Sequence, residues 1–587
     1  MIIKLLSTCF LILLSYLYIY YKIISNKLRK KAENFFKNQD INWKPKLRNE
    51  IIDDFKNTTF DIIIVGGGSS GVGCAIDATL RGLKVGLIEA DDFGSGVSSK
   101  CTKLLHGGVR YLEKAFNDID KSQFKLVLEA INERKIVMDS CPFLSRTIKL
   151  VFPVFKRIKL PYYYIGLAIY DWISGINSLG RSKFLSVQDT IDYFPHIKKE
   201  RLVGSISYFD GQFYDAKLNV LLALTAAYYN ATVINHAQLT CIKKENGKIV
   251  GITFFDKICE QEIHVKCKVL LNTTGPFTDK IRKLANEDSN SLLQQSYGSH
   301  IVVPASFSPK NMGFVDPNTA DGRLAFFINY KGKTLIGGTD IKCTTEKFIK
   351  PTEEDLNFLI HEANFYTDDS LKLTKKDVLA IWTGIRPLVK DTKKQNTEKI
   401  VRKHLIKIED DNLVTLTGGK WTIYRLMAEQ TIDKIIKYFN FKELEKCKTK
   451  YLKILGSLNY SKATEQDLSL ILKIPEDIGK HLATSYGTKA YLFENIFKGN
   501  YSRILDGYPY TKEEVIYCIE YEMAYKLSDI LFNRFLISYI DVRKAHQIMK
   551  PVCEIMTLKF NWDQQYVQKE IKECLSLLDT CGYSLLK

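Results

Sequence analysis

The stretch KLLHGGVRYLE, residues 103–113, places a lysine, a histidine and an arginine beside two glycines and a tyrosine. Cationic, hydrogen-bonding side chains next to residues without a side chain suit a site that an anion approaches closely. The alternative is an ordinary surface turn between two helices, without a binding role. The elements around the stretch must decide between these two interpretations.

A glycine-rich turn gives the strongest local signal. The β-branched run DIIIV, residues 61–65, predicts a buried strand and leads into GGGSSG, residues 66–71, which contains G-x-G-x-x-G. A second apolar run, residues 84–88, ends in Glu89. Such glycines form a turn close to a pyrophosphate, the following helix N-terminus binds the phosphates, and the acid accepts hydrogen bonds from a ribose diol. The spacing predicts a dinucleotide-binding βαβ unit.

Two further glycine turns follow at a distance. LLNTTGP, residues 270–276, predicts a strand that ends in a turn of small residues. LVTLTGGKWT, residues 413–422, predicts a strand, a glycine turn and an amphipathic helix that begins at Gly418 and Gly419. The first motif alone does not distinguish FAD from NAD. Three turns hundreds of residues apart favour FAD, because one long cofactor then lies across a discontinuous domain.

With these motifs the chain resembles the FAD-dependent, membrane-associated glycerol-3-phosphate dehydrogenases, within the D-amino-acid-oxidase-like flavoproteins. The resemblance covers about residues 60–435 and continues in the helical tail, in SYGTKA and YTKEEVIYCIEYEMAYKLSDILFNR. Its most specific parts are KLLHGGVRYLE and GIRPL. Further matching stretches are FDGQFYDAKL, NTTGPFTD, GSHIVVP, TLIGGTD, WTGIRPL and TGGKWTIYRLMAEQTID.

The resemblance implies an α/β fold. We expect an FAD-binding Rossmann-like domain of the glutathione-reductase type, an interleaved antiparallel-sheet substrate domain and a C-terminal α-helical domain. The boundaries that we predict are 1–45 for an N-terminal membrane anchor and its basic flank, 46–436 for the FAD- and substrate-binding part, and 437–587 for the helical domain.

The resemblance also implies a reaction. sn-Glycerol 3-phosphate is oxidised to dihydroxyacetone phosphate, FAD is reduced, and the electrons pass to a membrane quinone. Four residues at the family's motif positions are expected to bind the substrate, chiefly its phosphate, for which a guanidinium fork is well suited. They are Arg110, Tyr111, Arg386 and Lys420.

Oxidation of an alcohol needs a base for the hydroxyl proton as well as an acceptor for the hydride. His300 lies in an apolar strand pattern and is our candidate base, with His106 as the other candidate. A lone histidine is more often structural, and the family motif around each argues for the site. Arg386 is a third catalytic candidate, because its charge can stabilise the developing alkoxide.

The cofactor contacts that the motifs imply are spread over the whole flavin domain. For Asp340 an ordinary strand-end cap is an equally good interpretation. The predicted contacts are Gly66, Gly68, Ser70, Gly71, Glu89, Ser99, Thr102, Lys103, His106, Gly107, Gly108, Thr274, Gly275, Thr339, Asp340, Gly418, Gly419 and Lys420.

Two positions depart from the family pattern. Gly338 stands where a threonine is common, and Tyr214 stands where an acid is common, so we predict no cofactor contact at either. No C-x-x-C pair occurs among the 13 cysteines, and no calcium-binding loop follows residue 437. We therefore predict no metal site.

The formal net charge of +18 favours anionic lipid or anionic substrates. Lysines are spread along the chain without a basic stretch interleaved with aromatics, so we predict no nucleic-acid partner. Residues 5–21 carry no charge and are followed by basic residues, which predicts an uncleaved membrane anchor, with a cleaved signal peptide as the alternative. The stretch PVFKRIKLPYYYIGLAIYDW is either domain core or a basic-rimmed face on the lipid bilayer.

From the family we expect the mitochondrial inner membrane, with the site facing the intermembrane space; a bacterial plasma membrane would suit the same chemistry. A homodimer stays open. Two rival functions also remain. One is a glycerol-3-phosphate oxidase that reduces oxygen to peroxide, which a membrane anchor argues against. The other is a non-catalytic, membrane-held flavoprotein, which the predicted cations and histidines argue against.

Overall fold

The computed structural model describes most of the predicted site and the whole helical domain. The predicted anchor at residues 5–21 lies outside the described residues, as do Arg110 and Tyr111. Among the residues that are described, no helix is both long and apolar enough to cross a bilayer. The described residues are 30, 34–109, 112, 121–316, 325–344, 348–390 and 404–587.

The first sheet is built around an almost wholly apolar strand. β1 (Thr59–Val65) lies between and parallel to β2 (Val85–Ile88) and β10 (Gln261–Asn272). A strand covered on both faces carries a continuous apolar run, as DIIIV does. α3 (Ser69–Leu80) packs on β1 and β2, so the predicted Rossmann-like unit is confirmed. Within the described residues the sheet has eight strands, in the order β17 (His404–Ile408), β18 (Leu413–Gly418), β10, β1, β2 and β7 (Thr232–Ile234), with β9 (Lys248–Asp256) on β10 and β8 (Ala237–Glu245) on β9.

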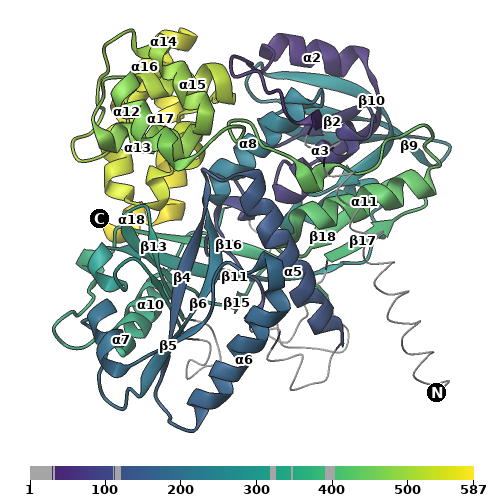
Figure 1. The fold of residues 1–587 in the computed structure, drawn as a ribbon. Coiled ribbons are helices and arrows are strands. Elements are labelled where there is room, and N and C mark those ends of the chain that lie inside the picture. Colours follow the sequence, from purple (N-terminus) through teal and green to yellow (C-terminus); the bar gives the residue numbers. More distant parts are fainter. Residues whose placement is uncertain are drawn as a thin grey trace, which may run out of the picture.

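A second sheet is formed by chain segments that alternate with those of the first (Figure 1). Its pairs are antiparallel, apart from the parallel pair β12–β4. The predicted interleaved antiparallel-sheet domain is thereby confirmed. In the described part of the chain its ten strands are β15 (Ile341–Lys342), β11 (Leu293–Val303), β14 (Lys333–Gly337), β13 (Ala325–Tyr330), β12 (Gly313–Asp316), β4 (Ser145–Val154), β6 (Gly204–Phe213) and β3 (Leu104–Leu105), with β16 (Ala380–Val389) on β11 and β5 (Lys183–Leu185) on β6.

Helices cover both sheets. α8 (Asp215–Tyr228) is buried over residues 215–226, because it packs against α3 on one side and against the C-terminal helices on another. α6 (Lys159–Ser174) covers the second sheet and lies at the end of the molecule remote from the C-terminal helices (Figure 1). The other helices on the sheets are α2 (Arg48–Asn57), α5 (Lys121–Ser140), α7 (Val187–Tyr193), α9 (Thr278–Ala285), α10 (Glu353–Tyr366) and α11 (Tyr424–Tyr438).

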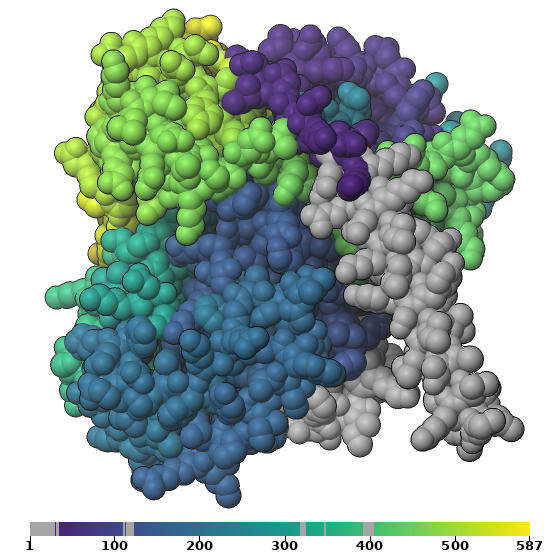
Figure 2. Space-filling model, in the orientation of Figure 1, coloured from purple at the N-terminus to yellow at the C-terminus, as the bar shows by residue number. Residues whose placement is uncertain are grey.

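The C-terminal region is helical, as predicted. It shares one apolar core with β11, β14 and β16 of the second sheet, and in Figure 2 its green and yellow surface lies directly above the teal and blue surface of the middle of the chain. The helical domain is therefore continuous with the sheet on which the candidate site is built. Its helices are α12 (Lys462–Ile471), α13 (Glu476–Tyr486), α14 (Phe493–Phe497), α15 (Lys512–Glu522), α16 (Val542–Phe560), α17 (Gln564–Leu578) and α18 (Tyr583–Leu586).

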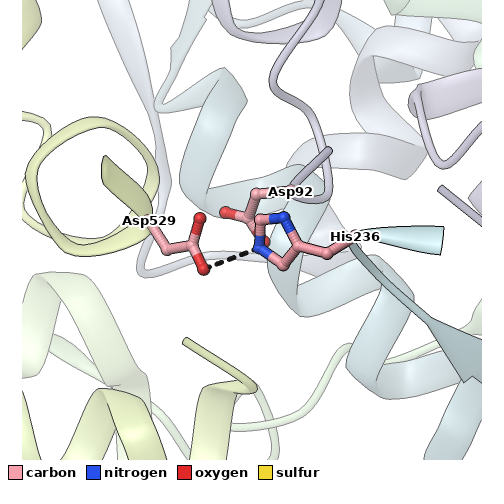
Figure 3. A group of neighbouring side chains, drawn as sticks. All are labelled: Asp92, His236 and Asp529. Atoms are coloured by element: carbon pink, nitrogen blue, oxygen red, sulfur yellow. Dashed lines mark hydrogen bonds and ion pairs between the residues drawn. The ribbon is translucent and has the colours of Figure 1, made fainter. Parts of the chain in front are cut away.

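Buried ionic contacts join the helical domain to the first sheet. Asp92, His236 and Asp529 converge there, and His236 Nε2 donates to Asp529 Oδ2 at 2.9 Å (Figure 3). Side chains of these types can hold a metal ion. However, the Asp92 carboxylate already accepts from the Arg534 guanidinium at 2.6 Å and from the amide of Asn533 at 2.8 Å. A metal ion would have to displace that guanidinium, so we interpret the group as an ionic contact between domains.

Candidate active site

The glycine turn after β1 forms one wall of a cavity of about 900 Å³. Gly66 has φ +105°, and a Cβ there would lie 2.8 Å from the Thr273 carbonyl oxygen. Gly68 caps α3 without a side chain, and the N-terminus of this helix faces the cavity through Gly68 and Ser70, while the Ser69 N–H donates to Ser98 Oγ at 3.0 Å. The turn therefore fits the pyrophosphate of FAD, as its spacing predicts.

Glu89 directly follows β2 and faces this turn. Its carboxylate accepts from the Gly67 N–H at 2.6 Å and from the Asp91 N–H at 2.9 Å. Burial, and then the neighbouring charge of Asp91, raise the pKa of Glu89 to about 7. The acid is thus placed for a ribose diol, and it changes charge near neutral pH.

The pKa of Glu89 predicts pH-dependent cofactor affinity. Ribose hydroxyls donate to the carboxylate and lower its pKa on binding, so the FAD dissociation constant should rise about fivefold to tenfold between pH 8 and pH 6. Titration of the FAD-depleted protein with FAD, followed by flavin fluorescence, measures this. Glu89→Gln should bind FAD more weakly and show little of the slope. An equal slope in Glu89→Gln would assign the effect to another group.

One face of the second sheet supplies part of the cavity floor. Trp382, His300, Gly337 and Phe326 are direct cross-strand neighbours on β16, β11, β14 and β13. Side chains opposite one another in antiparallel strands share a face. Gly337 leaves room for the imidazole, because a Cβ there would lie 2.1 Å from His300 Cδ2. These cross-strand neighbours place His300 on the cavity floor, close to the apolar side chain of Phe326.

His300 is buried and held on two sides. Its ring stacks on Trp382 with centroids 4.6 Å apart, and its Nε2 lies 3.1 Å from Thr102 Oγ1. Within the described residues Nδ1 has no hydrogen-bond partner. Burial, followed by the charges of Arg386 and Lys103, lowers the pKa of His300 to about 3. The imidazole is therefore neutral at physiological pH, but the same burial and charges make it a weak base in the structure without substrate.

Arg386 shares the face of His300. On β16 and β11, Arg386 pairs with Ser296, Gly298 with Gly384, and His300 with Trp382. The paired glycines leave room for neighbouring groups, since a Cβ on Gly384 would lie 2.8 Å from the Lys100 carbonyl oxygen. The guanidinium lies over Gly298, where a Cβ would be 2.1 Å from its NH2 group. This arrangement places a cation and a neutral base along one stretch of floor.

Neighbouring polar groups orient the Arg386 guanidinium. NH1 donates to Asp340 Oδ1 at 2.7 Å, and NH2 donates to the Thr339 carbonyl at 3.0 Å. For Asp340 an ordinary strand-end cap was one of two interpretations. In the structure its carboxylate instead forms an ion pair with Arg386. Thr339 in turn accepts from the Ser299 N–H through its hydroxyl at 2.8 Å.

His106 is in a different environment. Its Nδ1 lies 3.1 Å from Asp210 Oδ2, and its ring lies 5.3 Å from that of Phe326. Asp210 is fully buried and also accepts from Arg134 NH1 at 2.6 Å and from the Gly107 N–H at 2.9 Å. Burial alone would raise the pKa of Asp210, but the bonds and charges of His106 and Arg134 hold it below its usual range. The second histidine is thus backed by a carboxylate.

Most predicted site residues of the described chain line this one cavity. It brings the two histidines together with the glycine turns, Arg386 and Lys420, which lie hundreds of residues apart in sequence. Those that line the cavity are Gly66, Gly68, Ser70, Glu89, Thr102, His106, Gly108, Thr274, Gly275, His300, Thr339, Asp340, Arg386, Gly418, Gly419 and Lys420.

Four predicted contacts lie behind the cavity wall. Lys103 is fully buried, and its Nζ donates to Asp215 at 2.7 Å and to the Ser99 carbonyl at 2.5 Å. The Ser99 hydroxyl lies 2.9 Å from the hydroxyl of Tyr539 in the helical domain. At the third, Gly71, a Cβ would lie 1.9 Å from the Gly66 carbonyl oxygen, so this glycine serves helix–turn packing.

Gly107 is the fourth of these residues, and its lack of a side chain serves packing. A Cβ at this position would lie 1.7 Å from the Tyr170 hydroxyl and 2.8 Å from Arg134 NH1. The missing side chain thus makes room for α6 and α5, whereas Gly108 lines the cavity. We expected both glycines to bring the backbone near a ligand, and in this structure Gly108 alone is placed to do so.

The third glycine turn differs from its prediction in detail. Gly418 and Gly419 both have positive φ, +77° and +79°, and so form a left-handed turn instead of the first turn of a helix. A 3₁₀ turn, Trp421–Ile423, follows, and α11 begins at Tyr424. Lys420 lies in the turn and faces the cavity.

Three contributing residues were not predicted. Trp382 stands in the quoted motif WTGIRPL, but nothing in the sequence pairs it with His300. Asp210 and Arg134 become linked to His106 through contacts between distant segments. The acid in FDGQF was a usable signal, because an acid beside a site histidine often orients its ring.

Comparison with known proteins agrees with this geometry. A family model described as FAD dependent oxidoreductase matches residues 61–432. A second, described as the C-terminal domain of alpha-glycerophosphate oxidase, matches residues 447–567. FAD is therefore the cofactor of the cavity.

Named relatives extend over nearly the whole chain. A probable glycerol-3-phosphate dehydrogenase of Encephalitozoon cuniculi is 46% identical over 546 residues, 93% of this chain and 89% of that protein. The human mitochondrial glycerol-3-phosphate dehydrogenase is 37% identical over 554 residues, 92% and 76% of the two chains. The structure of the Bacillus halodurans glycerol-3-phosphate dehydrogenase with FAD has a TM-score of 0.75 at 26% identity and covers 92% of this chain and 98% of that one. The chain belongs to the FAD-dependent oxidoreductases, in the glycerol-3-phosphate dehydrogenase family.

Proposed function

We propose that this protein oxidises sn-glycerol 3-phosphate to dihydroxyacetone phosphate and passes the electrons to a membrane quinone. The observation that carries the proposal is the shared face of Arg386 and His300, with paired glycines between them, beside the dinucleotide groove. The cavity that Arg386 and His300 both line has room for a small substrate, with a guanidinium for its phosphate and a neutral imidazole for its hydroxyl.

The chain's own groups bind and orient the substrate. Arg386 binds the phosphate, and Asp340 and the Thr339 carbonyl hold its fork in place. Lys420, from the third glycine turn, adds a second cation at the cavity wall. Arg110 and Tyr111 remain predicted phosphate ligands, in keeping with the family motif. These groups set the C2–H bond toward the cofactor.

His300 takes the proton of the C2 hydroxyl, while bound FAD supplies the hydride acceptor. Its low pKa ensures that the imidazole is unprotonated before substrate binds. Burial is the main cause of this low pKa, and the dianionic phosphate at Arg386 offsets only the smaller part that comes from the positive charges, which makes His300 a stronger base when substrate is present. Arg386 also stabilises the negative charge that develops on the oxygen.

A membrane quinone as acceptor is supported by the outer surface of α6. Ile158, Trp172 and Ile176 are 87%, 82% and 98% exposed, on and beside this helix. Lys156 and Arg157 are exposed next to them. An apolar face with a basic rim suits an anionic lipid bilayer. We propose the mitochondrial inner membrane, with the site facing the intermembrane space, as the mitochondrial relatives suggest.

The membrane surface makes a specific prediction. With vesicles that contain anionic phospholipids with brominated acyl chains, the fluorescence of Trp172 should be quenched, because the indole enters the bilayer. Trp172→Phe should lose this component of the quenching, whereas Trp562→Phe, in the helical domain, should keep it. Quenching that is identical in the two variants would show that α6 does not enter the bilayer.

Anaerobic reduction tests the proposed reaction. Addition of sn-glycerol 3-phosphate to the purified holoprotein should bleach the flavin absorbance band, while glycerol at equal concentration should not. A quinone added next should restore the band much faster than air does. Faster reoxidation by oxygen, with peroxide formed, would instead support an oxidase. Absence of bleaching with FAD bound would contradict the assigned substrate.

A further inference from the structure

The two histidines of the cavity are held in opposite ways. His300 is buried between Trp382 and Thr102. The side chain of His106 is 32% exposed and contacts the fully buried Asp210 through Nδ1. A carboxylate that accepts from one imidazole nitrogen fixes the tautomer and stabilises the imidazolium. The ring of His106 is therefore oriented by a carboxylate, whereas the ring of His300 is oriented by an aromatic ring and a hydroxyl.

Near His106 the lining of the cavity is apolar and comes from α6 and the second sheet, and we call this part of the lining the apolar lobe. The ring of His106 leans on Phe326, which lies on the same row of the floor as His300, two strands away. Aromatic and aliphatic walls favour a flat, uncharged ligand. The residues that line the lobe are Leu104, Phe152, Tyr163, Leu167, Val315 and Phe326.

A buried chain of contacts ties α6 to His106. Tyr170 of α6 accepts from Arg134 NH1 at 2.8 Å, and Arg134 donates to Asp210 Oδ1 at 2.6 Å. Both residues are almost fully buried. The outer surface of the same helix is the proposed membrane face. A ligand that arrives from the bilayer thus meets the lobe beside α6, and this chain of contacts links α6 to His106.

We propose that His106, oriented by Asp210, donates a proton to a quinone ring bound in this apolar lobe. The inference rests on the proposed function and deepens it, since it divides the two half-reactions between two histidines. His300 serves oxidation of the substrate, and His106 serves reduction of the acceptor. Asp210 acts as a positioning residue, because it reaches the acceptor only through His106.

The proton count requires such a donor. A quinone takes up two electrons and two protons to become a quinol. FAD, when bound and reduced, would supply both electrons and one proton. The second proton comes from the His106 imidazolium: its N–H bond breaks, an O–H bond forms on the ring, and the neutral imidazole regains a proton from water through the exposed part of its side chain.

Two acceptors separate electron transfer from proton transfer. The holoprotein is reduced with dithionite, freed of excess reductant and mixed with either a short-chain benzoquinone or ferricyanide, which takes one electron at a time and no proton. In His106→Gln the ratio of the quinone rate to the ferricyanide rate should fall about a hundredfold. Asp210→Asn should lower it less, and His196→Gln, at the surface, should leave it unchanged.

Binding provides a readout other than turnover. Calorimetric titration of the oxidised protein with the benzoquinone should give similar dissociation constants for the wild type and His106→Gln, since the apolar walls make the contacts. Phe326→Asn should weaken binding about tenfold or more. The quinone rate of the wild type should also show a solvent deuterium isotope effect, which His106→Gln should alter.

Equal losses with both acceptors would overturn the proposal and place His106 in cofactor binding or substrate oxidation. Loss of FAD from both His106→Gln and His106→Asn would do the same. Because dithionite replaces the substrate, this test is independent of the proposed substrate. If sn-glycerol 3-phosphate fails to bleach the wild type while the acceptor ratio still depends on His106, the substrate is wrong and the proton donor stands.

Discussion

Replacement of Arg386 by alanine should lower kcat/KM for sn-glycerol 3-phosphate by about a thousandfold to ten-thousandfold. Loss of a guanidinium–phosphate contact raises KM, and loss of charge beside the developing alkoxide lowers kcat by about a hundredfold or more. Together these correspond to about 4–5.5 kcal/mol of transition-state stabilisation. Steady-state kinetics with a soluble electron acceptor measures both parameters.

The phosphate-free substrate makes this prediction specific. If Arg386 binds the phosphate, the alanine variant should lose most of the preference for sn-glycerol 3-phosphate over glycerol, because the residual reaction no longer uses the phosphate. Arg386→Lys should recover part of the activity, since it restores the charge without the fork. Arg503→Ala, which breaks a surface ion pair with Asp477 in the helical domain, serves as the matched control. Normal turnover in Arg386→Ala would remove the residue from the site.

The dinucleotide-binding wall of the cavity could be predicted because the residues that form it are close together in the sequence. The strand, the glycine turn and Glu89 follow one another within residues 61–89, and each has a fixed offset in a βαβ unit. His300 and Arg386 were also predictable as members of short motifs. That they share one sheet face follows from the register of β11 and β16, and that register was not visible in the sequence.

Contacts between distant segments explain what the motifs did not predict. His106 meets Asp210 across 104 residues, and Lys103 meets Asp215 across 112. Both histidines lie in family motifs, and sequence alone gave no reason to assign them to different half-reactions. A motif shows that a residue belongs to a site region. The role of the residue depends on the partner that the fold places beside it. Lys103 is buried against Asp215, whereas Lys420 lines the cavity.

Replacement of Lys103 is the second change for which we expect a large effect, in this case on stability. Lys103→Met should lower the free energy of unfolding by about 3–5 kcal/mol, because the Asp215 carboxylate would remain buried without its cation. Asp215 would keep the N–H groups of Cys101 at 3.2 Å and Ala216 at 2.9 Å, which are weak compensation for an ammonium. Urea unfolding followed by flavin fluorescence and circular dichroism measures the loss. Lys46→Met, which breaks the exposed pair with Asp54, should cost less than about 1 kcal/mol.

A second change distinguishes a structural lysine from a cofactor ligand. Lys103→Met/Asp215→Asn removes both charges and should recover more than half of the lost stability, since no uncompensated ion then remains in the interior. The FAD dissociation constant of the folded double variant should stay close to that of the wild type. Weak FAD binding in both variants with unchanged stability would instead restore Lys103 to the cofactor site, as its motif implies. A lysine in a glycine-rich, phosphate-binding context can therefore be a buried counter-ion of the fold, and these two measurements separate that role from direct contact with FAD.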